Sequence, residues 1–249
     1  MRPAALLLAV AACGPPPAPD QTVDYREDVV DGPSSGERGT MKISEILWSG
    51  SLTGDTWDRT DVFVELRNEG NRPINISGWE LQIRGALQRT FVIPDTDQKL
   101  QVGDQVFIAA KTDGCFPDAD LVISGLQFPL DAPFALTLVD ADERLMETAG
   151  DRDVPPFAGG FDLVTSRSME RVPLMFGSDA NRSQSWKYYQ AVACPGQDGT
   201  GLNCFIDGLG RATANNDRMR PECRRHTHAS PGRANSPDYT GAFANGSFE

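Results

Sequence analysis

The chain has 249 residues, of which 39% are hydrophobic and 23% are charged, and its formal net charge is −12 at pH 7. A chain of this length can form one sizeable domain with additional segments. Nucleic-acid binding requires a basic surface, so the acidic balance argues against nucleic acid as a partner. No apolar run has the length of a membrane-spanning helix.

The N-terminus has the organisation of a secretory signal, which we assign to residues 1–12. Arg2 supplies a positive charge, an apolar run extends to Val10, and small residues precede Cys13. Residues 10–13, VAAC, resemble a bacterial lipobox. The resemblance implies lipidation of Cys13 and, because Gly14 follows it, sorting to an outer membrane or the cell surface. An ordinary secretory signal and a chance cysteine in a disordered start are the alternatives.

The rest of the chain divides into three parts. Residues 13–40 are rich in Pro, Asp and Ser without apolar periodicity, which predicts a disordered tether. Residues 41–190 contain short apolar runs separated by turn residues, which predicts an all-β sandwich. We expect residues 191–249 to form a cysteine-containing loop segment and a tail.

The first predicted strand covers residues 41–48, although its apolar residues do not alternate cleanly. The stretch 61–81, DVFVELRNEGNRPINISGWEL, follows and predicts a β-hairpin, because two alternating runs flank a turn with Asn, Gly and Pro. In its first strand, Val62, Val64 and Leu66 would share one face, and Phe63 and Glu65 the other. Further short runs predict strands at 90–93, 105–109, 121–124, 134–139 and 145–148.

Several short segments, taken in chain order, together resemble the pattern of a known family. They are 43–46 (ISEI), 64–68 (VELRN), 76–81 (ISGWEL), 91–94 (FVIP), 100–106 (LQVGDQV) and 136–140 (LTLVD), followed by 168–171 (SMER), 184–186 (QSW) and 230–235 (SPGRAN). Their order resembles that of the lamin-tail domain. The resemblance implies an immunoglobulin-like β-sandwich, and bacterial members imply a secreted or envelope-attached module without catalysis. Two features depart from the family pattern: Ser44 replaces the usual Asn, and a cysteine-containing segment separates Trp186 from Ser230.

Four cysteines follow Cys13 in the sequence. An even number in an exported protein predicts two disulfides. We expect Cys194 to pair with Cys204, which would staple the Gly-rich loop between them, and Cys115 to pair with Cys223. All three connectivities of four cysteines remain open at this stage.

Metal sites are the alternative chemistry. Cys223, His226 and His228 have the spacing C-x2-H-x-H, but a zinc site would require reduced cysteines and a fourth ligand. Three acidic loops are candidates for binding Ca²⁺ through oxygen ligands, and a solvated acidic rim is the other interpretation. The loops contain Asp55, Asp58 and Asp61; Asp113, Asp118 and Asp120; and Asp140, Asp142 and Glu143. We expect Glu65 to be half-buried and paired with Arg67 or Arg84.

The segment 211–233 is locally basic, with six arginines and two acidic residues. Arg218, Arg220, Arg224 and Arg225 form a candidate polyanion patch for lipid head groups or acidic polysaccharide. The interpretation that we favour is a disulfide-held loop whose arginines pair with the acidic sandwich.

These features favour a lipid-anchored protein of the bacterial envelope whose sandwich is a non-catalytic binding or structural module. Its partners would be the membrane, through the lipid anchor, and an unspecified protein or polysaccharide. We expect no enzyme, since no residues have the pattern of a catalytic site. The alternatives are a metal-dependent hydrolase and a calcium-dependent adhesion module, both of which would use the acidic loops.

Overall fold

The structure is a computed structural model that describes residues 39–96, 99–172 and 179–237. The predicted signal peptide, Cys13, almost all of the tether and residues 238–249 lie outside the described residues. The described part is all-β, as the sequence predicts, and includes the short 3-10 helix η2 (Ser183–Ser185). No helix in this part is long and apolar enough to cross a membrane.

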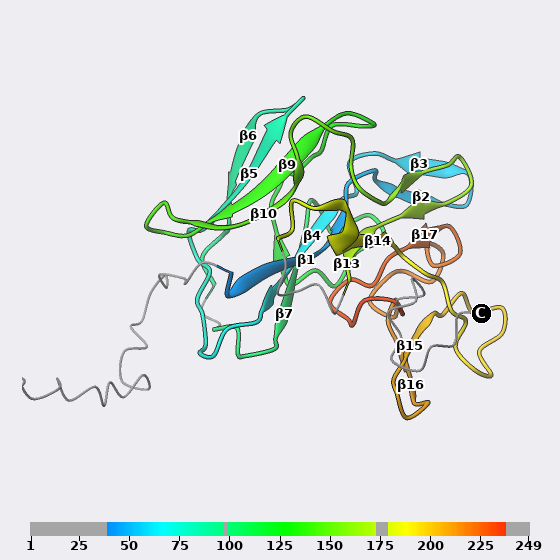
Figure 1. Cartoon of the computed structure of the whole chain (residues 1–249). Helices are drawn as coiled ribbons and strands as arrows, with labels where there is room; N and C mark the ends of the chain where they lie inside the picture. The colour runs from blue at the N-terminus through cyan, green and yellow to red at the C-terminus, as the bar shows by residue number, and fades with distance from the viewer. Residues whose placement is uncertain (1–38, 97–98, 173–178, 238–249) are drawn as a thin grey trace, which may run out of the picture.

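A six-stranded sheet forms one layer of the fold (Figure 1). Its strand order is β14-β13-β1-β4-β7-β8, and neighbours are antiparallel except for the parallel pair β7 and β8. Three of the predicted strands, at 41–48, 105–109 and 121–124, lie in this sheet. The strands are β1 (Met41–Leu47), β4 (Phe63–Asn68), β7 (Gln105–Ala109), β8 (Leu121–Val122), β13 (Met169–Arg171) and β14 (Trp186–Tyr188).

A four-stranded antiparallel sheet forms the second layer, with the order β10-β9-β5-β6. The strands predicted at 90–93, 134–139 and 145–148 correspond to three of its members. The strands are β5 (Glu80–Gly85), β6 (Arg89–Val92), β9 (Phe134–Val139) and β10 (Leu145–Asp151).

Smaller strand pairs lie beside the two layers. The strands β11 and β12 are antiparallel, and β12 pairs in parallel with β17, which comes from the C-terminal part of the chain. These strands have two or three residues each, too few to show alternation in the sequence. They are β2 (Ser51–Thr53), β3 (Thr56–Asp58), β11 (Gly160–Phe161), β12 (Ser166–Arg167), β15 (Cys204–Ile206), β16 (Ala212–Ala214) and β17 (Thr227–His228).

The main hydrophobic core lies between the two large sheets. Val62, Val64 and Leu66 contribute to it, whereas Phe63 belongs to a second cluster and Glu65 is buried outside the main core. The predicted division of this strand into two faces is therefore confirmed. Two sheets that pack their apolar faces together form a β-sandwich. The second sheet contributes Leu81, Ile83, Leu136 and Leu138 to the same core.

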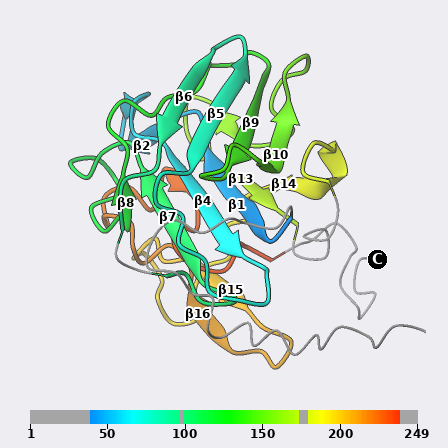
Figure 2. The same cartoon turned by 90° about the vertical axis from the view of Figure 1, so that its left-hand side faces the viewer.

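The C-terminal part covers the other face of the six-stranded sheet. Figure 2 shows its orange and red segments beside β4 and β7. The second cluster joins Phe63, Phe107 and Phe116 to Met219 and Cys223 of the C-terminal part. Because both faces of this sheet are covered, its central strands are apolar on the side of the main core and bury both aromatic and polar residues on the other side.

The hairpin predicted at 61–81 is wrong. The strand β4 pairs with β1 and β7 in the larger sheet, whereas β5 pairs with β6 and β9 in the smaller sheet. The chain between them crosses from one layer to the other, and Ile74 forms an isolated bridge with Leu100 on the way. Gly78 has φ of +72°, which provides the bend before Trp79.

The physical reason for this error is that alternation reports which face is apolar and not which strand lies alongside. Residues of β4 and of the 74–81 segment point into the same core from opposite layers, so both segments alternate. Trp79 is completely buried in that core.

The strand β1 contains a β-bulge. Its register with β4 shifts between Ile43 and Glu45, so Ser44 and Glu45 lie outside the main core while Ile43 and Ile46 lie within it. A bulge adds one residue to a strand and locally reorients its side chains. This explains why residues 41–48 do not alternate cleanly in the sequence.

Trp79 lies in the main core where the chain crosses from one layer to the other, so truncating it should destabilise the fold. We expect Trp79→Ala to lower the free energy of unfolding by about 3–5 kcal/mol, since the substitution removes a large core side chain and leaves a cavity. Val92→Ala is the matched control, because Val92 is 57% exposed on β6. Urea unfolding monitored by circular dichroism measures both, and an equal effect of the two substitutions would contradict the assignment.

Candidate functional site

Three glutamates form a row across the outer face of the six-stranded sheet. Glu45 of β1 lies opposite Glu170 of β13 on one side and opposite Glu65 of β4 on the other. All three side chains are completely buried. We call these three residues the glutamate cluster.

The C-terminal segment 230–236 donates a backbone hydrogen bond to each carboxyl group of the cluster. The backbone N–H of Ser230 donates to Glu45 Oε1 at 2.9 Å, and the N–H of Ser236 donates to Glu170 Oε1 at 2.9 Å. The N–H of Gly232 donates to Glu65 Oε2 at 2.6 Å. Each carboxyl group therefore accepts a hydrogen bond from a different residue of one backbone segment.

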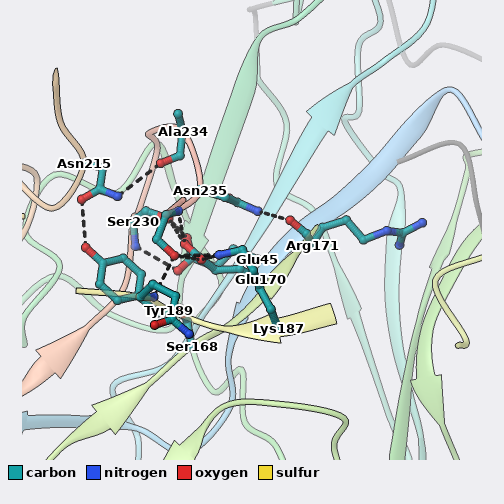
Figure 3. Close-up of polar contacts among 12 residues, drawn as sticks. Glu45, Ser168, Glu170, Arg171, Lys187, Tyr189, Asn215, Ser230, Ala234 and Asn235 are labelled. Atoms are coloured by element: carbon teal, nitrogen blue, oxygen red, sulfur yellow. Dashed lines mark hydrogen bonds and ion pairs between the residues drawn. The ribbon is translucent and has the colours of Figure 1, made fainter. Parts of the chain in front are cut away.

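One hydroxyl group lies between two of these carboxyl groups. Ser230 Oγ is 2.9 Å from Glu45 Oε2 and 2.7 Å from Glu170 Oε1 (Figure 3). A hydroxyl group has one proton to donate, so one of the two carboxyl groups must itself be the donor. Burial, together with the charges of Glu170 and Glu65, raises the pKa of Glu45 well above its usual range. The raised pKa favours the protonated form of Glu45, whose O–H can donate to Ser230 Oγ while Ser230 donates to Glu170.

A buried lysine compensates Glu170. Lys187 of β14 lies directly opposite Glu170, and its Nζ is 2.5 Å from Glu170 Oε2. The same Nζ donates to Ser236 Oγ at 2.7 Å. Removing either partner would leave an uncompensated buried charge, which is strongly destabilising. Through its second hydrogen bond, Lys187 also holds Ser236 at the end of the C-terminal segment.

Glu65 differs from its prediction in both burial and partners. Besides Gly232, its carboxyl group accepts hydrogen bonds from Ser44 Oγ at 2.6 Å and from Gln105 Nε2 at 2.8 Å. The guanidinium group of Arg84 instead donates to Gln82, Thr90 and two carbonyl groups. Arg67 forms an ion pair with Glu69 and acts on Glu65 as a nearby charge. Two neutral donors and a backbone N–H thus hold Glu65, which alternation alone did not indicate.

Two further buried side chains frame the cluster. Asn235 Nδ2 donates to the carbonyl oxygens of Ser44 and Arg171 at 3.1 and 2.8 Å, which ties the segment to β1 and β13. Tyr189 donates its hydroxyl proton to Asn215 Oδ1 at 2.8 Å, and burial raises the pKa of this tyrosine well above its usual range. The cluster therefore functions in the structure as the attachment point of the protein's own C-terminal segment.

The four cysteines form two disulfides with the expected pairing, Cys115–Cys223 and Cys194–Cys204. The first joins the loop after β7 to the segment before β17, across 108 residues. Cys223 is oxidised in this bond and cannot act as a thiolate ligand for a metal beside His226 and His228. His228 is partly buried, and this burial lowers its pKa below the usual range.

The acidic loops serve separate structural roles. Asp61 accepts hydrogen bonds from Ser51 Oγ and from the N–H of Cys115. Asp120 accepts from the N–H of Phe107, and Asp140 accepts from backbone N–H groups of its own turn. Within the described residues no group of three or more His, Cys, Asp or Glu side chains is arranged to hold a metal ion.

The arginines of the candidate polyanion patch bind neighbouring groups. Arg218 forms an ion pair with Asp120 at 2.7 Å and lies over the ring of Phe107. Arg220, Arg224 and Arg225 donate to backbone carbonyl groups of nearby loops. The contact between Arg218 and Asp120 is the kind of pairing with the sandwich that we favoured, and polyanion binding by this patch stays a prediction.

A groove of about 270 Å³ lies beside β11 and β12. Its walls include the aromatic side chains of Trp48, Phe161 and Tyr188, and the charged side chains of Asp131, Asp162 and Arg167. No pattern in the sequence indicates this groove, because its residues come from four separate segments of the chain.

Comparison of the chain with protein-family models finds no match, and comparison with curated proteins finds none either.

The buried glutamates predict a pH dependence of stability. Burial is the main cause that raises the pKa of Glu65 from an ordinary value of 4.5 to about 8. The folded protein thus keeps a proton that the unfolded chain releases, so the stabilisation is complete below the ordinary pKa and is lost as the pH rises toward 8. We expect the free energy of unfolding to fall by a few kcal/mol between pH 5 and pH 8.

The variant Glu65→Gln tests this prediction, because the amide keeps the size of a protonated carboxyl group and does not ionise. We expect a smaller fall between pH 5 and pH 8 in this variant, measured by guanidinium unfolding at each pH. Glu222→Gln is the control, since Glu222 is exposed. A pH profile of Glu65→Gln that matches the unmodified protein would contradict the assignment.

The two disulfides are expected to differ in their contribution to stability. Loop-closure entropy predicts about 4–5 kcal/mol for the bond that closes the longer loop and about 2–3 kcal/mol for the shorter one. The double variant Cys115→Ala/Cys223→Ala should therefore have the lower melting temperature by calorimetry. The double variant Cys194→Ala/Cys204→Ala is its matched control, and an equal or larger loss in that control would refute the ranking.

Proposed function

We propose that the protein is a lipid-anchored module of the bacterial envelope, in which a lamin-tail-like, immunoglobulin-like sandwich binds a ligand without catalysis. The observation that carries this proposal is the use of the buried carboxyl groups. Glu45, Glu65 and Glu170 all bind the protein's own C-terminal segment and lie away from solvent. The groups best suited to acid–base chemistry therefore serve as scaffold.

The resemblance to the lamin-tail domain gains support from where its motifs meet. The segments 43–46, 64–68, 168–171 and 230–235 each contribute a residue to the glutamate cluster or to its partners. Motifs that lie far apart in the sequence and share one buried network have a common structural purpose, which is to close the outer face of the sheet.

The position of the groove supports a binding role. In Figure 1, β1 begins at the left of the molecule, whereas β2, β3 and β17 lie at the right. The groove belongs to the second end, because β12 pairs with β17 and Phe161 stacks on Trp57 of β3. A tether joined to β1 would therefore enter at the end of the molecule opposite the groove, which leaves the groove open to a ligand.

Lipidation and envelope binding test the proposal. In a bacterium that processes lipoproteins, we expect mass spectrometry to find an acylated N-terminal Cys13 and the protein in the membrane fraction. Cys13→Ser should release the protein into the soluble fraction, because a thiol is required for the lipid attachment. Ser34→Ala, a substitution in the tether, is the control and should stay with the membrane.

The binding role needs its own measurement. The soluble Cys13→Ser protein should sediment with isolated envelopes in a saturable manner. A mature protein that retains Met1 would contradict the anchor, and the absence of saturable envelope binding at about 100 μM would contradict the binding role, since that bound corresponds to a standard binding free energy weaker than about −5 kcal/mol.

A further inference from the structure

The groove beside β11 and β12 has rigid aromatic walls. Trp48 donates its indole N–H to the carbonyl oxygen of Ala158 at 2.9 Å, which fixes the plane of its ring. Phe161 stacks on Trp57 with ring centroids 4.7 Å apart and an interplanar angle of 5°. Tyr188 is 47% exposed. Trp48 is only 4% exposed and belongs to the main core, so Phe161 and Tyr188 supply the aromatic surface that a ligand can contact.

Gly159 shapes one wall of this groove. It has φ of +77°, and a Cβ atom at this position would lie 2.9 Å from Trp48 Nε1 and equally close to the backbone of Arg167 and Met169. Only glycine allows the chain to lie this close to the indole ring. The close contact keeps residues 159–161 against Trp48 and leaves the groove between them and Tyr188 open.

The charged side chains at the groove are of both signs. The side chains of Asp131 and Arg167 form no hydrogen bond or ion pair within the described ranges, although both line the groove, and Arg167 acts on Asp162 as a nearby charge. Asp162 accepts hydrogen bonds from the backbone of Val164 and Thr165, which closes the turn between β11 and β12. These hydrogen bonds also lower the pKa of Asp162, so its carboxylate stays charged.

The apolar surface continues past the groove. Leu163 and Val164 follow Asp162 in the chain and are 83% and 66% exposed. Leu163 has φ of +73° and Asp131 has φ of +48°, conformations that non-glycine residues adopt at a cost and that cluster at functional sites. Large exposed side chains beside a groove are typical of an interaction surface.

We propose that this groove binds a neutral saccharide unit of a longer chain. The aromatic walls fit the apolar C–H face of a sugar ring, while the carboxylates can accept hydrogen bonds from its hydroxyl groups and Arg167 can donate to them. Asp131 and Asp162 repel an anionic ligand, and Arg167 repels a cationic one. A neutral polyhydroxyl ligand can hydrogen-bond with all three without bringing a like charge close to any of them.

The dimensions agree with this ligand class. Pockets for drug-sized ligands have volumes of about 300–1,000 Å³, and the groove is slightly smaller than this range. It therefore has room for about one ring, and adjoining units would lie along the exposed surface of Leu163 and Val164. The inference rests on the proposed binding role and specifies its ligand.

Calorimetric titration of the soluble Cys13→Ser protein tests this inference. The probes are neutral tetrasaccharides of glucose, galactose, mannose and N-acetylglucosamine, with a heparin tetrasaccharide as the anionic probe and phosphocholine as the zwitterionic probe that carries a quaternary ammonium group. We expect at least one neutral tetrasaccharide to bind. Tyr188→Ala and Arg167→Ala should each raise its dissociation constant about tenfold, whereas the controls Leu209→Ala and Arg89→Ala, on other exposed surfaces, should leave it unchanged.

Each of the other outcomes has a defined meaning. Three results would overturn the inference: preference for heparin or phosphocholine, no binding of neutral tetrasaccharides up to about 10 mM, and binding whose dissociation constant is unchanged by Tyr188→Ala and Arg167→Ala. Saturable envelope binding together with any of these results leaves the binding role intact and assigns it to a protein or to another surface. Circular dichroism of each variant confirms that the fold is retained.

Discussion

The burial of three glutamates side by side is the constraint on which the rest of the structure depends. Adjacent strands place Glu45, Glu65 and Glu170 in one row, where desolvation and mutual repulsion oppose ionisation. Such a row is stable only if it is protonated in part, compensated by a cation and supplied with donors. Lys187 and the backbone of segment 230–236 meet these needs. The C-terminal segment is therefore a necessary part of the sandwich.

This requirement explains how the C-terminal part of the chain is organised. Its loops contain little regular structure, so disulfides and ion pairs hold them in place of a long ladder of backbone hydrogen bonds. The bond between Cys115 and Cys223 lies in the second hydrophobic cluster, and Arg218 crosses to Asp120 of the sandwich. The arginines that look like an anion-binding patch in the sequence are largely engaged in this attachment.

The same arrangement separates scaffold from surface. One face of the six-stranded sheet is closed by the second sheet and the other by the C-terminal part, so a ligand can reach this sheet only at the ends of its strands. The aromatic groove formed by Trp48, Phe161 and Tyr188 lies at one such end. Loops on a rigid scaffold are where binding sites commonly occur, and this supports our assignment of the groove.

The sequence by itself determined the all-β class, the positions of the long strands and the two faces of β4, because these depend on local alternation and turn residues. It favoured one pairing of the cysteines, which only the structure decided. Tertiary structure decided that residues 61–81 cross between layers, that Glu65 is buried against Gly232, and that the groove exists. Each depends on contacts between segments far apart in the chain. Alternation specifies which face of a strand is apolar, whereas the partner on that face is set by packing of the whole chain.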